Sequence, residues 1–202
     1  EFYKPLYNAA PTHLLPVILQ DSAGVSFFYW GLPPGWAKNK NVSEKLVNVR
    51  AEGFTEKASA RKALRKHRCL VPADGFYNWK KVGKKTMIPY RYTLADKSVF
   101  SIPGIWEEFE DNEGNTHHTF MIITTETATQ ERVPIILDKA KEIAWMNNSA
   151  SEQELLATLQ SPSEKLDFYT VSPRINDTTV NVASLIMPAP PSDQFGNLTL
   201  FD

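Results

Sequence analysis

Residues 69–81 read CLVPADGFYNWKK, and this stretch combines a short apolar run, a turn and an aromatic-rich segment. Proline presets φ and glycine supplies conformational freedom, so PADG at residues 72–75 predicts a turn. A strand is expected to restart at Phe76. Because strand side chains alternate between faces, Asn78 then shares one face with Phe76 and Lys80. An amide between aromatic residues is more typical of a binding site than of a plain hydrophobic core.

Short strands are predicted on both sides of this stretch, from hydrophobic alternation and from the turn residues that separate the runs. They are expected at residues 13–19, 25–30, 47–52, 76–81, 87–94, 98–107, 118–125, 129–137 and 168–172. Pro16 and the Pro103-Gly104 pair are expected to break two of them. Helices are expected at residues 55–67, 139–146 and 151–159, with N-caps at Thr55, Asp138 and Ser151. Many short strands with few helices predict an α+β fold whose sheets are mainly antiparallel.

The composition indicates a globular protein. With 202 residues, 42% of them apolar, the chain can bury a substantial core as one domain. No apolar run approaches the roughly 18 residues of a membrane span. The single cysteine, Cys69, excludes an intramolecular disulfide and suits a reducing compartment such as the cytoplasm. Its apolar neighbours predict a buried structural thiol rather than a reactive one.

No cofactor or metal is predicted, and the chain is expected to be a monomer. His117 and His118 adjoin a turn at residues 111–116, but consecutive histidines in a strand point to opposite faces. A third ligand at suitable spacing is also missing from the sequence pattern, so a metal site is not expected there.

Charge is segregated along the chain. Residues 38–97 hold 16 Lys and Arg against 5 Asp and Glu, whereas the rest of the chain holds 6 against 18. This asymmetry indicates a basic surface for phosphates on an otherwise acidic protein. The alternative is that these lysines serve only solubility on exposed faces.

Two further features can be interpreted either as a site or as ordinary structure. Asn48, Arg50 and Glu52 alternate with apolar residues, which places an amide, a guanidinium and a carboxylate on one strand face. Such a face is either solvent-exposed or a binding site. Trp36 lies in the GLPPGW loop at residues 31–36, where it is either a lid on the core or a stacking platform for a base or sugar ring.

Six segments, taken in order, resemble the SOS-response-associated peptidase (SRAP) family. They are YNAAP (7–11), WGLPPGW (30–36), NVRAE (48–52), RCLVPADGFYNWKK (68–81), ERVPIIL (131–137) and TVSPRIN (170–176). The resemblance implies mainly antiparallel twisted sheets that form a barrel-like core with a few peripheral helices. It also implies one domain over residues 1–202, without the family's N-terminal segment before Glu1. The prolines at residues 188–191 predict a loosely packed tail at residues 188–202.

The resemblance further implies recognition of abasic sites in single-stranded DNA during the DNA-damage response, with peptidase- or lyase-type activity. In that family, a cysteine directly after the initiator Met crosslinks to the ring-opened sugar, because its α-amine and thiol together close a thiazolidine ring on the aldehyde. That cysteine is expected upstream of Glu1. The protein is expected in the cytoplasm, associated with the nucleoid if the source is bacterial.

The resemblance also assigns site residues. Asn48 matches the asparagine beside the N-terminal cysteine, and Arg50 and Arg132 match arginines that hold DNA phosphates, which guanidinium groups suit. Asn78 and Gln130 stand where the family has an acid–base glutamate and histidine. Neither amide titrates near neutral pH, and loss of general acid–base help costs about 10²–10⁴ in rate. Further DNA-binding positions are expected at Trp36, Asn8 and Pro11.

Two alternatives to covalent chemistry remain. In the first, the chain is a non-catalytic module that binds single-stranded DNA, and Asn78 and Gln130 form hydrogen bonds to DNA instead of moving protons. In the second, it is a small hydrolase of an unrelated polar substrate, which could use His117, His118 or Asp74.

Overall fold

The computed structural model describes residues 4–33, 46–56, 58–110, 113–128, 131–160 and 166–199. Its contacts divide the chain into two compact units. The larger unit comprises Pro11–Ala73 and Phe100–Glu164, and the smaller comprises Glu1–Ala10, Asp74–Val99 and Lys165–Asp202. The chain therefore passes from the larger unit to the smaller one within the PADG turn. One domain over residues 1–202 stays a prediction.

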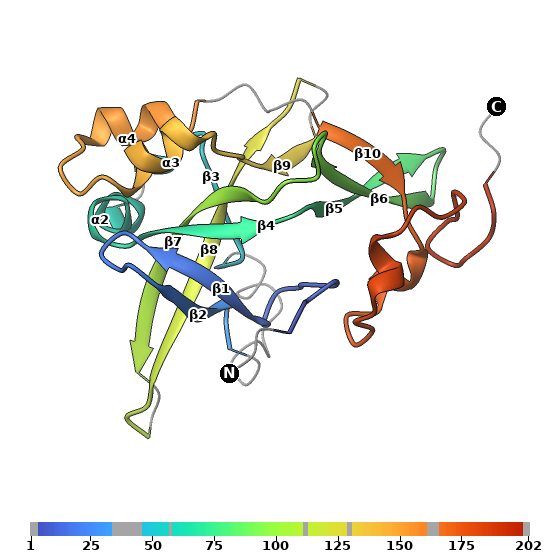
Figure 1. Ribbon diagram of the computed structural model, residues 1–202, viewed down its shortest axis with the longest axis horizontal. Coiled ribbons are helices and arrows are strands. Elements are labelled where there is room, and N and C mark those ends of the chain that lie inside the picture. Colours follow the sequence, from blue (N-terminus) through green and yellow to red (C-terminus); the bar gives the residue numbers. More distant parts are fainter. Residues whose placement is uncertain are drawn as a thin grey trace. The chain divides into compact units, whose positions relative to one another are not determined.

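The larger unit is built on a barrel of five strands (Figure 1). In barrel order these strands are β2 (Val25–Trp30), β1 (Leu14–Leu19), β4 (Arg68–Ala73), β7 (Phe100–Glu110) and β8 (Thr116–Glu126). Each pairs antiparallel with the next, and a short parallel pairing of β2 with β8 closes the ring. Two short strands, β3 (Asn48–Arg50) and β9 (Arg132–Pro134), pair with the C-terminal part of β8, outside the barrel. β3 runs parallel to β8 and β9 antiparallel to it.

The two predicted proline breaks are wrong. Pro16 stays inside β1, where it is the partner of Phe27. Pro103 and Gly104 continue β7, which pairs with β4 on one edge and β8 on the other. Gly104 is needed there, because a Cβ at this position would lie 2.9 Å from the Cys69 sulfur and 3.0 Å from the Met121 carbonyl oxygen. A proline removes only one donor, so ladders on both edges keep the strand regular.

Three helices lie against the barrel of the larger unit (Figure 1): α2 (Ala58–Lys66), α3 (Lys139–Met146) and α4 (Glu152–Thr158). The predicted caps of α3 and α4 are confirmed, since Asp138 accepts from the Lys141 N–H and Ser151 forms a capping box with Glu154. Thr55 instead lies inside the 3-10 helix η2 (Phe54–Glu56). Helices and strands share one buried apolar cluster: Phe54, Ala60, Ala63, Leu64, Leu70, Ile105, Met121, Ile123, Ile135, Leu137, Trp145, Leu155 and Leu159.

Arg68, the first residue of β4, connects this strand to the ends of two helices. Its side chain is among the most buried of the described part, at 1% exposure. The guanidinium donates to the carbonyls of Trp145 at 2.6 Å and Asn147 at 2.9 Å, at the end of α3. It also donates to the carbonyls of Leu64 and Arg65 in the last turn of α2. A fixed cation thus satisfies carbonyls that helix termini otherwise leave without donors.

Cys69 is a structural residue, as predicted. It is fully buried, and burial raises the pKa of its thiol well above the usual range. Its carbonyl accepts from the indole N–H of Trp145 at 3.0 Å, which adds a second link between β4 and α3. A thiol that stays protonated is a poor nucleophile.

The smaller unit contains a three-stranded antiparallel sheet in the order β10 (Leu166–Thr170), β6 (Thr86–Leu94), β5 (Phe76–Val82). The predicted restart of the strand at Phe76 is confirmed. One face of this sheet is covered by the segment that follows β10, which includes the 3-10 helices η3 (Pro173–Asn176) and η4 (Ala183–Ile186). The core on that face is formed by Val171, Ile175 and Leu185, with Tyr77, Tyr169 and Val180 packed against them.

Arg91 of β6 holds the turn that enters the smaller unit. Its buried guanidinium forms an ion pair with Asp74 at 3.0 Å and donates to the Tyr169 hydroxyl at 3.0 Å. A Cβ on Gly75 would lie 2.9 Å from this guanidinium and 2.8 Å from the Tyr92 carbonyl oxygen, so the turn requires glycine. Asp74 and Gly75 therefore position the start of β5.

The predicted fold class is confirmed: α+β, mainly antiparallel, with a barrel-like core and a few peripheral helices. Part of the tail is attached to the sheet of its own unit, because Gln194 accepts from the Met87 N–H and donates to the Lys85 carbonyl. Within the described ranges, none of the helices has the length and hydropathy that crossing a bilayer requires.

Candidate nucleic-acid interface

In the larger unit, β3 presents two polar side chains to solvent. Asn48 and Arg50 are exposed, whereas Val49 between them is partly buried, so the alternation predicted from the sequence is present. In the described part of the chain, neither polar side chain forms a hydrogen bond or an ion pair. An amide and a guanidinium without protein partners are available to an incoming anion.

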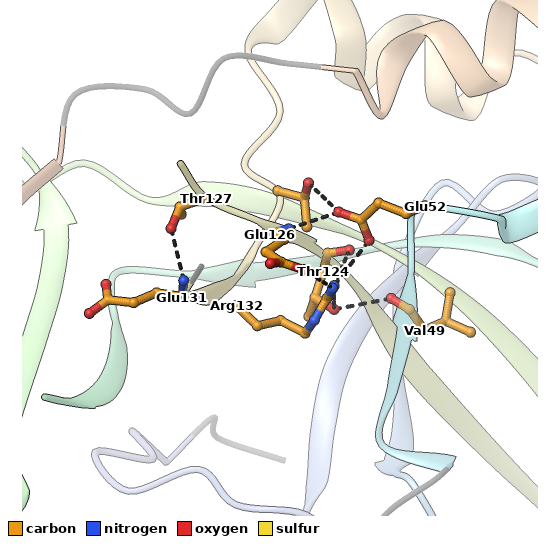
Figure 2. Close-up of polar contacts among 8 residues, drawn as sticks. Val49, Glu52, Thr124, Glu126, Thr127, Glu131 and Arg132 are labelled. Atoms are coloured by element: carbon orange, nitrogen blue, oxygen red, sulfur yellow. Dashed lines mark hydrogen bonds and ion pairs between the residues drawn. The ribbon is translucent and has the colours of Figure 1, made fainter. Parts of the chain in front are cut away.

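Arg132 lies on β9, on the opposite side of β8 from β3, and its guanidinium is already paired (Figure 2). It contacts the carboxylate of Glu52 at 3.2 Å and that of Glu126 at 3.5 Å. It also lies 3.3 Å from the Thr124 hydroxyl. Because the Arg132 side chain keeps 27% exposure, a phosphate could reach it, but would have to share it with two carboxylates.

Glu52, just beyond the end of β3, is the centre of this network. Its carboxylate accepts hydrogen bonds from the Glu126 backbone N–H at 2.8 Å and from the Thr125 hydroxyl at 2.9 Å (Figure 2). It also accepts from the Arg132 guanidinium at 3.2 Å. Partial burial opposes its ionisation, but these hydrogen bonds outweigh burial and lower the pKa of Glu52 to about 2. Glu52 therefore remains an anion at all physiological pH values.

Replacing Glu52 by glutamine is expected to destabilise the protein by about 1 kcal/mol at pH 7, a figure reduced for the screening of a half-exposed carboxylate. The pKa of Glu52 is lowered from 4.5 to about 2 on folding, so its contribution is complete above pH 4.5 and is lost as pH falls toward 2. Denaturant unfolding of wild type and Glu52→Gln at several pH values should show the difference shrinking over that window.

Glu110→Gln is the matched control, because Glu110 is an exposed carboxylate near the end of β7. Its stability difference from wild type should stay near zero at pH 7. A constant gap between wild type and Glu52→Gln from pH 7 to pH 2 would contradict the assigned network.

The hairpin from β8 to β9 is closed next to this network. The Glu131 N–H donates to the Thr127 hydroxyl at 3.1 Å (Figure 2). The Thr127 N–H also donates to the Glu131 carbonyl at 2.8 Å. Gln130, predicted as a degenerate acid–base position, lies outside the described residues, as does Trp36. Pro11 is exposed near the start of the larger unit.

Asn78 belongs to β5 of the smaller unit, where it is the partner of Tyr90 and partly buried. Its side-chain oxygen accepts from the backbone N–H of Trp79 at 2.9 Å. The indole N–H of Trp79 donates to Asn176 of η3 at 2.9 Å. In the described part of the chain the Asn78 amide NH₂ group has no partner, so it is available to others, whereas Trp79 is fixed by a hydrogen bond within its own unit.

Asn8, predicted to bind DNA, has a structural role in the smaller unit. Its side chain is 4% exposed, and its amide nitrogen lies 3.0–3.3 Å from the carbonyl oxygens of Ile175, Asp177 and Val180. These contacts attach the first residues of the chain to the segment around η3. A DNA contact by Asn8 stays a prediction.

Two of the three residues of the hydrolase alternative, Asp74 and His118, are engaged in pairs. Asp74 pairs with Arg91, and His118 lies 3.0 Å from the Glu108 carboxylate on the neighbouring strand. Among the described residues there is no group of three or more His, Cys, Asp or Glu side chains that could hold a metal ion. These pairs account for both residues without a catalytic role.

Sequence reasoning did not find Thr124, Thr125 and Glu126 as parts of the site. The sequence indicates only that they end a buried strand. Their contacts with Glu52 and Arg132 depend on the registers of β3 and β9 against β8. Threonine pairs followed by a glutamate carry no signal of their own.

Comparison with known proteins gives consistent results. The model of the family described as SOS response associated peptidase (SRAP) matches residues 1–178. The chain is 36% identical over 193 residues to abasic site processing protein YoqW of Bacillus subtilis (strain 168), with 91% of this chain and 86% of that protein covered. It is 28% identical over 233 residues to abasic site processing protein HMCES of Rattus norvegicus, with 93% and 66% covered.

A crystal structure of a protein from Bacteroides thetaiotaomicron shares the fold. Its TM-score is 0.75 at 31% sequence identity, and the match covers 88% of this chain and 82% of that chain.

Proposed function

The chain belongs to the SOS response associated peptidase (SRAP) family, and on this premise we propose that it recognises abasic sites in single-stranded DNA as part of the DNA-damage response. The observation that carries the proposal is the exposed pair Asn48 and Arg50 on β3, with the paired guanidinium of Arg132 on the other side of β8. The relatives named abasic site processing proteins support it.

Arg50 is the better of the two arginines for binding phosphate. Its guanidinium has no protein partner in the described part of the chain, whereas Arg132 is held by two carboxylates. A planar guanidinium matches phosphate oxygens in a bidentate geometry. In this proposal Arg50 supplies most of the phosphate affinity, and Arg132, kept in place by Glu52 and Glu126, supplies orientation.

We further propose a covalent step for a full-length protein that has an N-terminal cysteine upstream of Glu1. The α-amine of that cysteine adds to the sugar aldehyde and loses one water to form an imine. Its thiol then adds to the imine carbon, and the thiol proton passes to nitrogen to give a thiazolidine. No oxidant or reductant is required. Cys69 cannot replace this cysteine, because it is buried, protonated and has no free α-amine.

The location and assembly of the protein belong to the same proposal. The buried free thiol of Cys69 fits a reducing compartment such as the cytoplasm, and a DNA ligand fits association with the nucleoid in a bacterium; the protein is proposed to be a monomer. Size-exclusion chromatography with light scattering tests the monomer.

The test uses the full-length protein with single-stranded oligonucleotides that do or do not carry one abasic site. We expect tighter binding to the abasic strand and an adduct that survives denaturation. Arg50→Gln should weaken binding about tenfold and reduce the salt slope by about 0.7, the value for one phosphate on a single strand. Lys139→Gln removes an exposed charge from α3, ion-paired with Glu142 at 2.7 Å, and should change neither quantity.

Equal affinity for abasic and undamaged strands would contradict the proposed recognition. Selective binding without any adduct, from a protein whose N-terminal cysteine is confirmed by mass spectrometry, would remove the covalent step and leave the binding module. Unchanged affinity in Arg50→Gln would mean that another residue binds the phosphate.

A further inference from the structure

The sheet of the smaller unit has a second face that carries a group of aromatic rings. Phe76 and Phe168 are both partners of Tyr92, from β5 and β10 on its two sides, and Asn78 is the partner of Tyr90. Directly opposed residues in antiparallel strands point to the same face. We call Phe76, Tyr90, Tyr92 and Phe168 the aromatic face. It is the face that Asn78 shares, opposite to the one that packs on Val171 and Leu185.

The rings of the aromatic face pack on one another. Phe76 stacks on Tyr92 with 5.0 Å between ring centroids and 6° between planes. Phe168 contacts both Tyr92, at 5.5 Å, and Tyr90, at 5.9 Å. Tyr92 is buried, yet 53% of Phe168 is exposed. The inner rings thus support Phe168, which remains half-exposed to solvent.

Lysines lie over the Phe168 ring and in the turn of the same hairpin. The ammonium of Lys80 lies 4.1 Å from the centroid of Phe168 and 4.9 Å from that of Tyr90. Lys84 and Lys85 are exposed in the turn of the same β5–β6 hairpin, whereas Lys81 alternates with Lys80 along β5 and points to the opposite face. A cation over a ring stabilises a sheet by itself. That role explains Lys80, but neither the half-exposed phenyl ring nor the two lysines of the turn.

Exposed rings beside a row of cations are what single-strand binders use, because bases stack on the rings while cations follow the phosphates. We propose that the aromatic face is a stacking platform for unpaired bases of single-stranded DNA. Phe168 is the residue that the base contacts, and Lys80 with Lys84 and Lys85 of the turn contacts the backbone. This inference deepens the proposed function and rests on it for the identity of the ligand. The platform is expected to add affinity for single strands whether or not they carry an abasic site.

The first test measures binding of an undamaged oligothymidine to the full-length protein by fluorescence anisotropy over a range of salt concentrations. Phe168→Leu keeps an apolar side chain against Tyr92 and removes only the flat ring. We expect about tenfold weaker binding with an unchanged salt slope, as loss of one stacked base predicts. Lys80→Gln should instead lower the salt slope by about 0.7. Phe195→Leu alters a phenyl ring in the same unit with 80% exposure and should bind as wild type.

The second measurement locates the base. Strands with 2-aminopurine at successive positions should show fluorescence quenching at one or two positions in wild type, and this quenching should be lost in Phe168→Leu. Equal affinity and equal quenching in wild type and Phe168→Leu overturn the platform, and so does a wild type that does not bind undamaged strands. If wild type shows no preference for abasic strands but Phe168→Leu still binds oligothymidine more weakly, the proposed function fails while the platform stands.

Discussion

Replacing Arg68 by methionine is expected to lower the free energy of unfolding by about 3–5 kcal/mol, since removal of a buried cation leaves its partners unsatisfied. Methionine fills much of the same volume, so the loss comes mainly from carbonyls at the ends of α2 and α3 that keep no donor. Two helices and β4 are attached through this one side chain. Urea unfolding at pH 7, followed by circular dichroism, measures the change.

Two variants separate this role from a general loss of charge. Arg65→Met removes an arginine one turn away whose side chain is 72% exposed and only ion-paired with Glu152 at 3.5 Å, so less than about 1 kcal/mol should be lost. Arg68→Lys retains the charge, but one ammonium cannot span both helix ends, so most of the loss should remain. If Arg68→Met proves as stable as Arg65→Met, the guanidinium does not hold the helices.

Much of the fold could be predicted because it depends on local chemistry. Asp138 and the Ser151–Glu154 capping box mark helix starts within a few residues, and the alternating runs at 14–19 and 25–30 pair as one hairpin. The proline breaks could not be judged in this way. Whether Pro103 interrupts β7 depends on its pairing with Leu70 of β4, 33 positions earlier, and on the β8 ladder that begins at the next residue, Gly104.

The same distinction holds for the candidate site. The period of two around Asn48 and Arg50 is visible in the sequence, and their exposure follows from it. The pairing of Arg132 with Glu52 joins residues 80 positions apart, so it depends on two strand registers that no local pattern specifies. Likewise, Phe168 lies far from β5 in sequence and approaches Lys80 only through the register of β10 against β6.

Asn78→Glu is expected to accelerate adduct formation by about 100-fold, at the lower end of the range for general acid–base catalysis, because Gln130 leaves the second acid–base position without a titrating group. Asn78 stands where the family resemblance implies a glutamate, and it shares its sheet face with Lys80. A nearby ammonium favours the ionised form of the introduced carboxylate, which could then accept a proton from the attacking amine. Single-turnover rates on saturating abasic single-stranded DNA measure the effect.

Asn78→Gln is the matched control, since it has the length of glutamate and no titrating group. Its rate should stay at the wild-type level across pH, whereas the rate of Asn78→Glu should fall as its carboxylate becomes protonated in acid. Equal rates for the two variants would mean that side-chain length, not proton transfer, governs this position. No acceleration in either variant, with DNA affinity intact, would mean that the chain uses Asn78 to form hydrogen bonds with its ligand, as a binding module does.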